Sequence, residues 1–356
     1  MIIAVIGAGN GGQAIAGHMA AKGHEVRLYA RRQEQVDNLK MKGEIRLTGK
    51  LNGIAGKLAL VTNNIADVIV DADLIMVATT ASAHKTLAQI MAHYLTDGQY
   101  IVLNPGRTCG ALEFRKTLIE NGCNKRLYIA EAQTLVYACR IVTTGEVNII
   151  GIKDRVLISA LPASDTKAVI KKLEPMYTCF YPAKNILQTS FENIGAMFHP
   201  AVVLFNEAAI ERGQQFYFYR EMTPALAHMI ETLDKERLAI AKAYNIDLIS
   251  AKDWVSYAYE GVKGESLCER MQNNPAYYEI LSPITINCRQ ITEDVPTGIM
   301  PMAALGKVAG VETPVMDALV TMCSTLLKRD FRTDGRTLES LGLERLSAKE
   351  ILDKIH

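Results

Sequence analysis

A histidine stands in an apolar, helix-like stretch near the middle of the chain. Residues 192–211 read ENIGAMFHPAVVLFNEAAIE, and Pro200 directly follows His199. Proline removes a backbone donor and disfavours helical angles at the residue before it, so we expect a disturbed helix at His199. Because histidine titrates near neutral pH, this ring could accept and donate protons. A lone histidine on an apolar helix is more often a core residue, and that alternative stays open.

A second polar cluster lies far along the chain. Residues 287–296 read NCRQITEDVP, follow an extended apolar run and precede a helix that we expect to begin near Thr297. Arginine binds carboxylates through paired hydrogen bonds, so Arg289 suits a substrate that carries a carboxylate. Acidic residues at a helix start also stabilise the helix itself, which is the alternative explanation of this cluster. Asn193 and Thr292 are further candidates for substrate contact.

The beginning of the chain predicts a nucleotide-binding unit. The apolar run at 2–6 ends in GAGNGG at 7–12, and a helical pattern and a second strand follow. Gly7 allows a tight turn, Gly9 lets a pyrophosphate approach the backbone, and Gly12 lets the helix pack closely. A glycine-rich turn without a ligand is the alternative, but the required strand and helix are both in place. The candidate residues of this dinucleotide loop are Gly7, Gly9, Asn10, Gly11 and Gly12.

The end of the second strand bears on which dinucleotide binds. An acidic residue usually stands there in sites that prefer NAD, where it binds the ribose 2′-hydroxyl. The sequence instead has Tyr29-Ala30-Arg31-Arg32. Arg31 and Arg32 could bind a 2′-phosphate through charge-assisted hydrogen bonds, or they could be solvated loop residues. We favour NADP over NAD.

Strands and helices continue to alternate along the first half. We expect strands at 58–61, 74–78, 100–103 and 127–130, a helix at 82–94 and strand-like residues at 146–161. This order predicts a doubly wound parallel sheet, in which ligands bind at the carboxyl ends of the strands. The polar residues at those ends are Thr79, Thr80 and His84, then 104–108 with Asn104 and Gly106, and Glu131. His84 is equally well explained as a residue that starts a helix.

The pattern changes to long helices after about residue 187. Thr223-Pro224 and Thr313-Pro314 each resemble an N-cap followed by a proline in the first turn, and predict helices that run to about 244 and 328. We therefore predict an α/β chain with two domains. Residues 1–185 form a Rossmann-type nucleotide-binding domain, and residues 186–356 form an all-helical substrate and catalytic domain.

Composition excludes several other classes of protein. The 356 residues are 49% apolar and 22% charged, and the net charge of +1 gives no sign of a nucleic-acid or membrane partner. The seven cysteines form no CxxC pair, which indicates reduced thiols in the cytoplasm and no metal site. We expect neither a signal peptide nor a membrane span. The helical domain offers apolar faces that could form a homodimer or pack within the chain.

Six stretches together resemble the octopine/nopaline (opine) dehydrogenase family. They are GAGNGG at 7–12, NPGRTCGALEF at 104–114, EAQTLVYACR at 131–140, FENIGAMFHP at 191–200, RQITEDVPTGIMP at 289–301 and GVETP at 310–314. They follow the family's order over nearly the whole chain. The resemblance implies a Rossmann domain followed by a helical domain, with the active site in the cleft. It also implies that His199 is the catalytic acid/base, that Asp294 is its carboxylate partner, and that Arg289 binds a substrate carboxylate.

Enzymes of this family reductively condense an amino acid with an α-keto acid such as pyruvate, or oxidise the resulting secondary amine. The forward reaction needs an imine, a hydride donor and a proton donor and acceptor. A carboxylate such as Asp294 on the far ring nitrogen would fix the histidine tautomer. The two product carboxylates need cationic partners, for which Arg289 is the first candidate and Arg140 the second. Arg31 and Arg32 depart from the members of the family that favour NAD.

Two other functions stay open. A ketopantoate reductase-like or glycerol-phosphate dehydrogenase-like enzyme would act on hydroxy compounds and commonly uses a lysine in the helical domain. Lys184 precedes the helices, but nothing in the sequence marks it as catalytic. A sensor of NADP(H) would bind the cofactor without chemistry, and the combination of His199, Arg289 and Asp294 counts against it.

Overall fold

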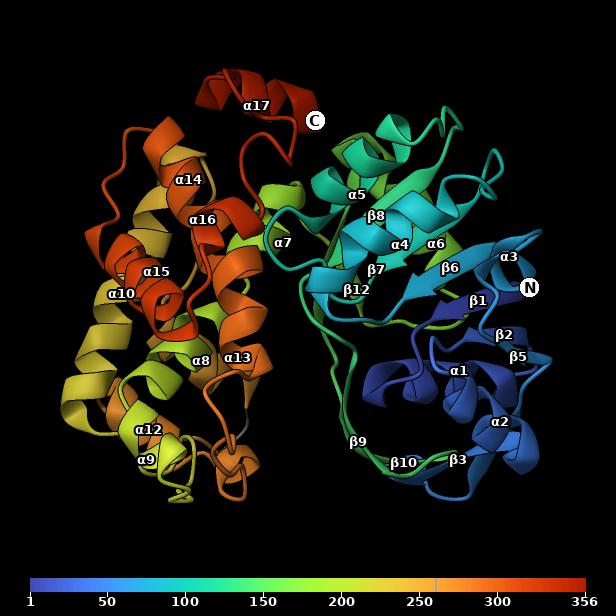
Figure 1. Cartoon of the computed structure of the whole chain (residues 1–356), viewed down its shortest axis with the longest axis horizontal. Coiled ribbons are helices and arrows are strands. Elements are labelled where there is room, and N and C mark those ends of the chain that lie inside the picture. The colour runs from blue at the N-terminus through green and yellow to red at the C-terminus, as the bar shows by residue number, and fades with distance from the viewer. Residues whose placement is uncertain (260) are drawn as a thin grey trace. The chain divides into compact units, whose positions relative to one another are not determined.

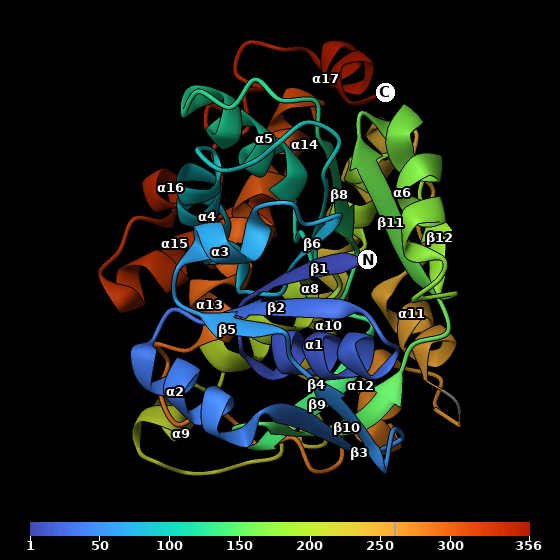
Figure 2. The ribbon, with the colours of Figure 1, turned by 90° about the vertical axis from the view of Figure 1, so that its right-hand side faces the viewer.

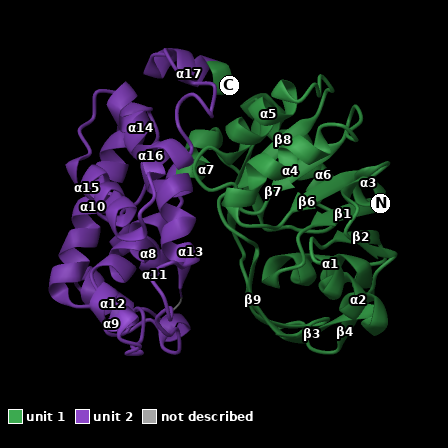
Figure 3. Cartoon of the chain, viewed as in Figure 1, with its two compact units in different colours: residues 1–190, 354–356 green, residues 191–353 purple. Residues whose placement is uncertain are grey.

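The structure, a computed structural model, describes residues 1–259 and 261–356, which fall into two compact units (Figure 3). Unit 1 comprises residues 1–190 and 354–356, and unit 2 comprises residues 191–353. Unit 1 contains a mostly parallel sheet with helices, and unit 2 is built of helices (Figure 1). The predicted fold class is therefore confirmed.

Eight strands form the main sheet of unit 1 in the order β12-β11-β8-β7-β6-β1-β2-β5. Their bounds are β1 Ile2–Ile6, β2 Glu25–Tyr29, β5 Leu60–Thr62, β6 Leu74–Val77, β7 Tyr100–Leu103, β8 Tyr128–Ala132, β11 Val156–Leu161 and β12 Phe180–Pro182. Neighbouring strands run parallel, except that β11 pairs antiparallel with β8. The central strands are continuous apolar runs because helices cover both faces, and Ile3, Val5 and Ile75 have no exposed surface.

The helices of unit 1 connect these strands. They are α1 Asn10–Ala21, α2 Gln33–Lys42, α3 Ile65–Ile69, the 3-10 turn η1 Ala81–Ala83, α4 His84–Met91, α5 Gly110–Glu120, the 3-10 turn η2 Ala163–Asp165 and α6 Thr166–Leu173. Helix α7, Ile186–Phe191, contains Ser190, the last residue of the long segment 1–190 of unit 1. The expected helix at 82–94 is thus shorter than predicted.

A second sheet of unit 1 was not expected from the sequence. Its order is β4-β3-β10-β9, with bounds β3 Glu44–Gly49, β4 Ile54–Lys57, β9 Tyr137–Thr143 and β10 Glu146–Ile152. Helix α1 lies between the two sheets (Figure 2), and a Cβ atom on Gly56 would stand 2.1 Å from the Gly17 carbonyl oxygen. The run expected as one strand-like segment at 146–161 is therefore two strands, which the polar residues 153–155 separate.

Unit 2 consists of helices and connecting turns. Its elements are α8 Gly195–Leu204, α9 Glu207–Glu211, α10 Pro224–Ala243, α11 Ala251–Ala258, α12 Leu267–Gln272, the 3-10 turn η3 Pro275–Tyr277, α13 Arg289–Thr292, the π-helix η4 Val295–Ile299, α14 Met300–Val308, α15 Pro314–Leu327 and α16 Phe331–Asp334. The last helix, α17 Ala348–Ile355, extends into the final residues of the chain. Among the described residues, no helix is both long enough and apolar enough to cross a bilayer.

Both threonine–proline pairs begin helices at the predicted residues. Helix α10 starts at Pro224, and the Thr223 hydroxyl accepts a hydrogen bond from the Leu226 backbone N–H. Helix α15 starts at Pro314, but Thr313 makes no side-chain cap and instead donates its hydroxyl to Asp317. The Thr-Pro pair therefore precedes both helices, but the threonine caps only α10.

A buried ion pair joins the helices of unit 2. Arg237 on α10 has no exposed surface and lies 2.7 Å from the Asp234 carboxylate. Its guanidinium also donates to the carbonyl oxygens of Phe191 and Ile249, and Asp234 accepts from the Ala251 N–H. Because a charge buried in this way must have its hydrogen bonds satisfied, the network fixes the chain before α8 and the start of α11 against α10.

Candidate active site

The glycine-rich loop joins β1 to α1 in the geometry that a dinucleotide needs. Gly7 has a φ of +107°, and a Cβ atom on Gly12 would lie 1.7 Å from the Gly7 carbonyl oxygen, so both positions require glycine. A Cβ atom on Gly9 would contact nothing within 4 Å, so the space beside this residue is open. The N-terminus of α1 begins at the next residue, and its free N–H groups suit a pyrophosphate.

Neighbouring segments of unit 1 hold this loop. The Asn10 carboxamide oxygen accepts a hydrogen bond of 2.9 Å from the Ile141 N–H on β9. The Leu135 side chain packs so closely on Gly11 that a Cβ atom there would lie 2.8 Å from its Cδ2. These contacts show a structural role for Asn10 and Gly11 that the glycine pattern alone did not reveal, because their partners lie more than 120 residues away in the sequence.

Arg31 and Arg32 lie at the end of β2, where the sequence places them. Both are exposed, and Arg32 is the N-cap residue of α2. Ala30 lies between them and the strand and is buried, and none of residues 29–32 is acidic. Two exposed guanidinium groups at this edge can bind a phosphate, which carries more charge than a ribose hydroxyl.

The carboxyl ends of β6, β7 and β8 carry the other predicted residues of unit 1. The Thr79 hydroxyl follows β6, is buried and makes no hydrogen bond with a described residue. His84 is the first residue of α4 and is fully buried. After β7, the Asn104 amide donates a hydrogen bond of 2.9 Å to the Val102 carbonyl. Thr79 thus has a free buried hydroxyl for a ligand, whereas Asn104 uses its amide within its own turn.

Glu131 is the centre of a buried network at this edge. Its carboxylate has no exposed surface and accepts hydrogen bonds from the Ala111 N–H at 2.8 Å, the Thr189 hydroxyl at 2.7 Å and the Ser190 hydroxyl at 3.1 Å. A Cβ atom on Gly106 would lie 2.4 Å from the Glu131 Cβ. Glu131 therefore contacts three segments of unit 1: the loop after β7, the start of α5 and helix α7.

His199 and Asp294 meet in unit 2. The His199 Nδ1 atom lies 2.7 Å from the Asp294 Oδ2 atom, although the two residues are 95 positions apart. The Asp294 side chain is 1% exposed and the His199 side chain 22% exposed. The ring is therefore held on one side by a buried carboxylate and reaches solvent on the other. This arrangement suits transfer of a proton through Nε2.

The two elements that bring this pair together are unusual. Helix α8 continues through His199 and Pro200, so the disturbance expected at His199 does not end the helix, although Pro200 lacks the N–H that would bond to the Ala196 carbonyl. Asp294 directly precedes the π-helix, a form frequently found at functional sites. A Cβ atom on Gly298 would lie 2.8 Å from the Ala196 Cβ, so glycine allows the π-helix and α8 to approach.

The polar residues around this pair differ in exposure. The Arg289 side chain is 60% exposed, and its Nε atom lies 3.8 Å from the buried Glu293 carboxylate. Asn193 is 2% exposed beside Gly298. The Thr292 hydroxyl donates to the Cys288 carbonyl one turn earlier. Arg289 thus has an accessible charge, whereas the Thr292 hydroxyl is occupied within its helix.

Aromatic side chains lie beside the histidine. The ring centroids of Phe218 and Tyr219 lie 6.2 and 6.4 Å from that of His199. Tyr219 stacks on Tyr277 with centroids 4.3 Å apart, and Tyr277 donates its hydroxyl to Tyr259 at 3.0 Å. Burial raises the pKa of Tyr219. These rings come from turns between helices, where periodicity gives no signal.

Arg140 and Lys184 both belong to unit 1. Arg140 is exposed on β9, opposite Asn148 on β10. Lys184 is exposed before α7, and its backbone N–H donates to the Gln188 side chain.

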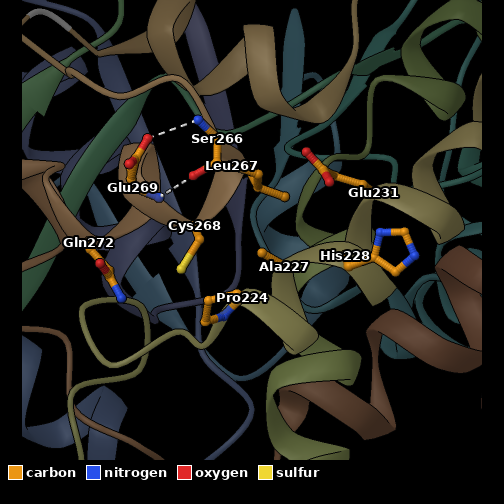
Figure 4. A pocket seen from close by; sticks show the side chains of 9 residues that line it. All are labelled: Pro224, Ala227, His228, Glu231, Ser266, Leu267, Cys268, Glu269 and Gln272. Atoms are coloured by element: carbon orange, nitrogen blue, oxygen red, sulfur yellow. Dashed lines mark hydrogen bonds between the residues drawn. The ribbon is translucent and has the colours of Figure 1, made fainter.

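The cavity shown in Figure 4, of about 260 Å³, is in unit 2 between α10 and α12, and no predicted site residue lines it. Within residues 1–259 and 261–356, no three His, Cys, Asp or Glu side chains gather to hold a metal ion.

The cavity's polar groups already serve local structure. Glu269 and Ser266 form the capping box of α12, and Cys268 and Gln272 both donate to the Met222 carbonyl. Figure 4 shows His228 and Glu231 on the opposite wall. The cavity therefore gives no support for a second reactive centre.

Family comparisons match segments of both units. Residues 182–327 match the family described as NAD/NADP octopine/nopaline dehydrogenase, alpha-helical domain. Residues 2–129 match the N-terminus of NAD-dependent glycerol-3-phosphate dehydrogenase. The chain is 38% identical to the opine dehydrogenase of Arthrobacter sp. (strain 1C) over 98% of its own length and 97% of the relative. It is 26% identical to the vitopine synthase of Allorhizobium ampelinum over 99% of each chain.

Solved structures have the same fold. An octopine dehydrogenase with NADH and L-arginine superposes with a TM-score of 0.83 at 21% identity, covering 98% of this chain and 97% of that one. A yersinopine dehydrogenase with bound NADP+ gives a TM-score of 0.78 at 14% identity, covering 100% and 97%. The chain therefore belongs to the opine dehydrogenase family, whose members are NAD(P)-dependent oxidoreductases that act on CH–NH groups.

Proposed function

We propose that this chain uses NADPH to join an amino acid to an α-keto acid, with His199 as the acid/base of the reaction. The observation that carries the proposal is the bond of 2.7 Å between His199 Nδ1 and the buried carboxylate of Asp294. NADPH would supply the hydride that reduces the imine formed by the two substrates. The protein must then move protons and hold two carboxylates.

The paired side chains suit proton transfer at a fixed atom. Nδ1 of His199 donates to Asp294, which leaves Nε2 as the atom that accepts a proton. Nε2 would take a proton from the ammonium group of the amino acid, so that its nitrogen can attack the keto carbon. It would return that proton to the hydroxyl group that leaves as water when the imine forms. Asp294 stabilises the ring while it carries the charge.

Arg289 would bind a substrate carboxylate. Its guanidinium is largely exposed and precedes Asp294 by five residues, so one short segment presents both groups. The carboxylate of Glu293 lies 3.8 Å from the Arg289 Nε and attracts the guanidinium. Arginine offers two parallel N–H donors, which match the two oxygens of a carboxylate. Asn193, which precedes α8, is a further candidate contact, and its amide lies beside Gly298 of the π-helix.

The first experiment follows oxidation of NADPH and of NADH at the nicotinamide absorbance, with pyruvate and a panel of amino acids. Each reaction is paired with one that lacks the amino acid. We expect oxidation to require both substrates, and the panel then identifies the amino acid. Oxidation with pyruvate alone would instead indicate a keto-acid reductase, and binding of NADPH without any turnover would contradict the proposed reaction.

Cofactor preference is tested separately. We expect the double variant Arg31→Ala/Arg32→Ala to weaken NADPH binding by about 10- to 100-fold and NADH binding by less than about twofold, since only NADPH carries the 2′-phosphate. Titration of nicotinamide fluorescence measures both dissociation constants. Lys40→Ala, which removes an exposed charge elsewhere on α2, is the matched control. Equal loss for both cofactors would contradict the assignment of the arginine pair.

A further inference from the structure

Tyr219 is held in unit 2 by aromatic contacts on several sides. Its ring stacks on Tyr277 with the centroids 4.3 Å apart, and the rings of Phe218 and Phe198 meet it edge-on at 4.8 and 6.5 Å. The backbone beside it is also fixed, since the Phe218 N–H donates a hydrogen bond of 2.7 Å to the Ile280 carbonyl. The residue is only 6% exposed, so close packing gives its side chain a defined orientation.

The hydroxyl of Tyr219 differs from the hydroxyls next to it. Tyr277 donates its hydroxyl to Tyr259 at 3.0 Å, whereas the Tyr219 hydroxyl makes no hydrogen bond with any residue that the structure describes. Unlike the Thr79 hydroxyl, which the protein covers completely, it keeps some contact with solvent. A hydroxyl on a buried and fixed ring is therefore available to a ligand that accepts a hydrogen bond.

The groups assigned to the reaction in unit 2 are near this hydroxyl. The Tyr219 ring centroid lies 6.4 Å from that of His199, whose Nδ1 atom contacts Asp294. Burial, followed by the charges of Tyr259 and Asp294, raises the pKa of the phenol, and the charge of Arg289 lowers it. The net effect is upward, so the hydroxyl stays protonated at neutral pH and can only be useful to an anion as a donor.

We infer that the Tyr219 hydroxyl donates a hydrogen bond to the substrate carboxylate that Arg289 binds. This inference rests on the proposed function. A carboxylate offers about four lone-pair directions and a bidentate arginine uses two of them, so one oxygen can accept a further hydrogen bond. Because both donors belong to unit 2, they would hold the substrate at a defined place relative to the His199 ring.

The test removes each donor in turn. Tyr219→Phe deletes the hydroxyl and keeps the ring contacts, and Arg289→Ala deletes the cation. Titration calorimetry measures the binding of pyruvate and of each amino acid of the panel, one at a time, to the enzyme–NADPH complex. We expect both variants to weaken binding of the same substrate, Tyr219→Phe by about tenfold, as for a lost hydrogen bond to a charged group.

Two controls separate this effect from a loss of structure. Tyr217→Phe removes a hydroxyl from the same segment and should bind every substrate like the wild type. The melting temperature of Tyr219→Phe should not fall, because the ring stays and no hydrogen bond within the described residues is lost. In condensation, Tyr219→Phe should raise the KM of that one substrate about tenfold and leave kcat and its pH profile within about twofold, since the His199–Asp294 pair is intact.

Each outcome bears on one of the two assignments. Unchanged binding of every substrate by Tyr219→Phe would overturn the role of Tyr219, and so would weaker binding of a substrate that Arg289→Ala leaves unaffected. If binding of one substrate depends on both side chains but the wild-type enzyme condenses no amino acid, the role of Tyr219 is supported and the proposed reaction fails. If condensation proceeds with an unchanged KM in Tyr219→Phe, the proposed reaction stands and the role of Tyr219 fails.

Discussion

The glycine loop of unit 1 and the His199–Asp294 pair of unit 2 are built in opposite ways. The loop consists of six consecutive residues, and four of them are glycines, so its backbone rather than its side chains makes the site. The pair consists of two side chains that come from elements 95 residues apart. The loop is therefore sensitive to added atoms and the pair to removed ones, which separates the effects of substitution on cofactor binding from those on turnover.

The largest effect is expected when the histidine is removed. His199→Ala should lower turnover by about 10³- to 10⁴-fold, at the upper end of the usual contribution of general acid–base catalysis. NADPH binding should be unchanged, because the dinucleotide loop belongs to unit 1. Steady-state kinetics and fluorescence titration measure the two effects. His228→Ala, an exposed histidine on α10, should be close to wild type. Near-normal turnover of His199→Ala would show that His199 is a core residue.

A smaller loss is expected when the carboxylate is made neutral. Asp294→Asn keeps the shape of the side chain but cannot stabilise a protonated ring, and it can hold the wrong tautomer. We expect turnover to fall about 10²-fold, at the lower end of the range for acid–base groups. Asp317→Asn on the exposed face of α15 should have no effect. If Asp294→Asn lost no more turnover than Asp317→Asn, the assignment of Asp294 as the partner of His199 would be contradicted.

Two glycines of the loop should separate packing from ligand binding. Gly12→Ala places a Cβ atom 1.7 Å from a backbone oxygen, so we expect it to lower the free energy of unfolding by about 1–3 kcal/mol and to weaken NADPH binding. Gly9→Ala meets open space and should leave thermal unfolding unchanged. It should still weaken NADPH binding, because the pyrophosphate needs that space. If Gly9→Ala binds NADPH normally, the phosphates lie elsewhere.

A glycine contact in unit 2 should act on the pair indirectly. Gly298→Ala introduces a contact of 2.8 Å with Ala196 on α8, which we expect to displace His199 from Asp294 and reduce turnover about tenfold. Gly306→Ala on α14 is the matched control, because its added Cβ atom would lie similarly close, 3.0 Å, to the Thr313 side chain. Both variants should melt at a lower temperature, but only Gly298→Ala should lose turnover at a temperature where both are folded. Equal turnover would argue against this positioning role.

The smallest effect concerns the pH dependence of stability in unit 1. Burial, with a contribution from the charge of Lys22, lowers the pKa of His18 to about 4. Its Nδ1 atom is 2.6 Å from the Tyr137 hydroxyl. Above pH 6.5 the ring is neutral in both states. As pH falls from 6.5 toward 4, the unfolded chain binds the proton first, so the free energy of unfolding should decrease.

Urea unfolding between pH 4 and pH 7.5 measures this slope. His18→Gln should flatten it, whereas His93→Gln, at an exposed position, should leave it unchanged. Identical slopes for His18→Gln and wild type would show that other groups govern the acid side of the stability profile.

Much of unit 1 could be predicted because its signals are local. The turn at Gly7, the burial of residues 3–6 and the arginines after β2 all follow from neighbours in the sequence. The second sheet was missed because β3 pairs with β10 about 100 residues later, and the alternation of EIRLTG in β3 does not indicate which strand is its partner. The helix through Pro200 was also unexpected, since packing in unit 2 overrides the preference of an isolated proline.

The sequence by itself determined the residue types at the site, the alternation of strands and helices in the main sheet, and the family to which the chain belongs. These depend on short motifs and on periodicity, which neighbouring residues encode. Only the tertiary structure decided that the His199 ring contacts the Asp294 carboxylate, that aromatic rings lie beside the histidine, and that Glu131 packs on the turn after β7. Each of these contacts joins residues distant in the chain, and their geometry depends on how whole helices and strands pack.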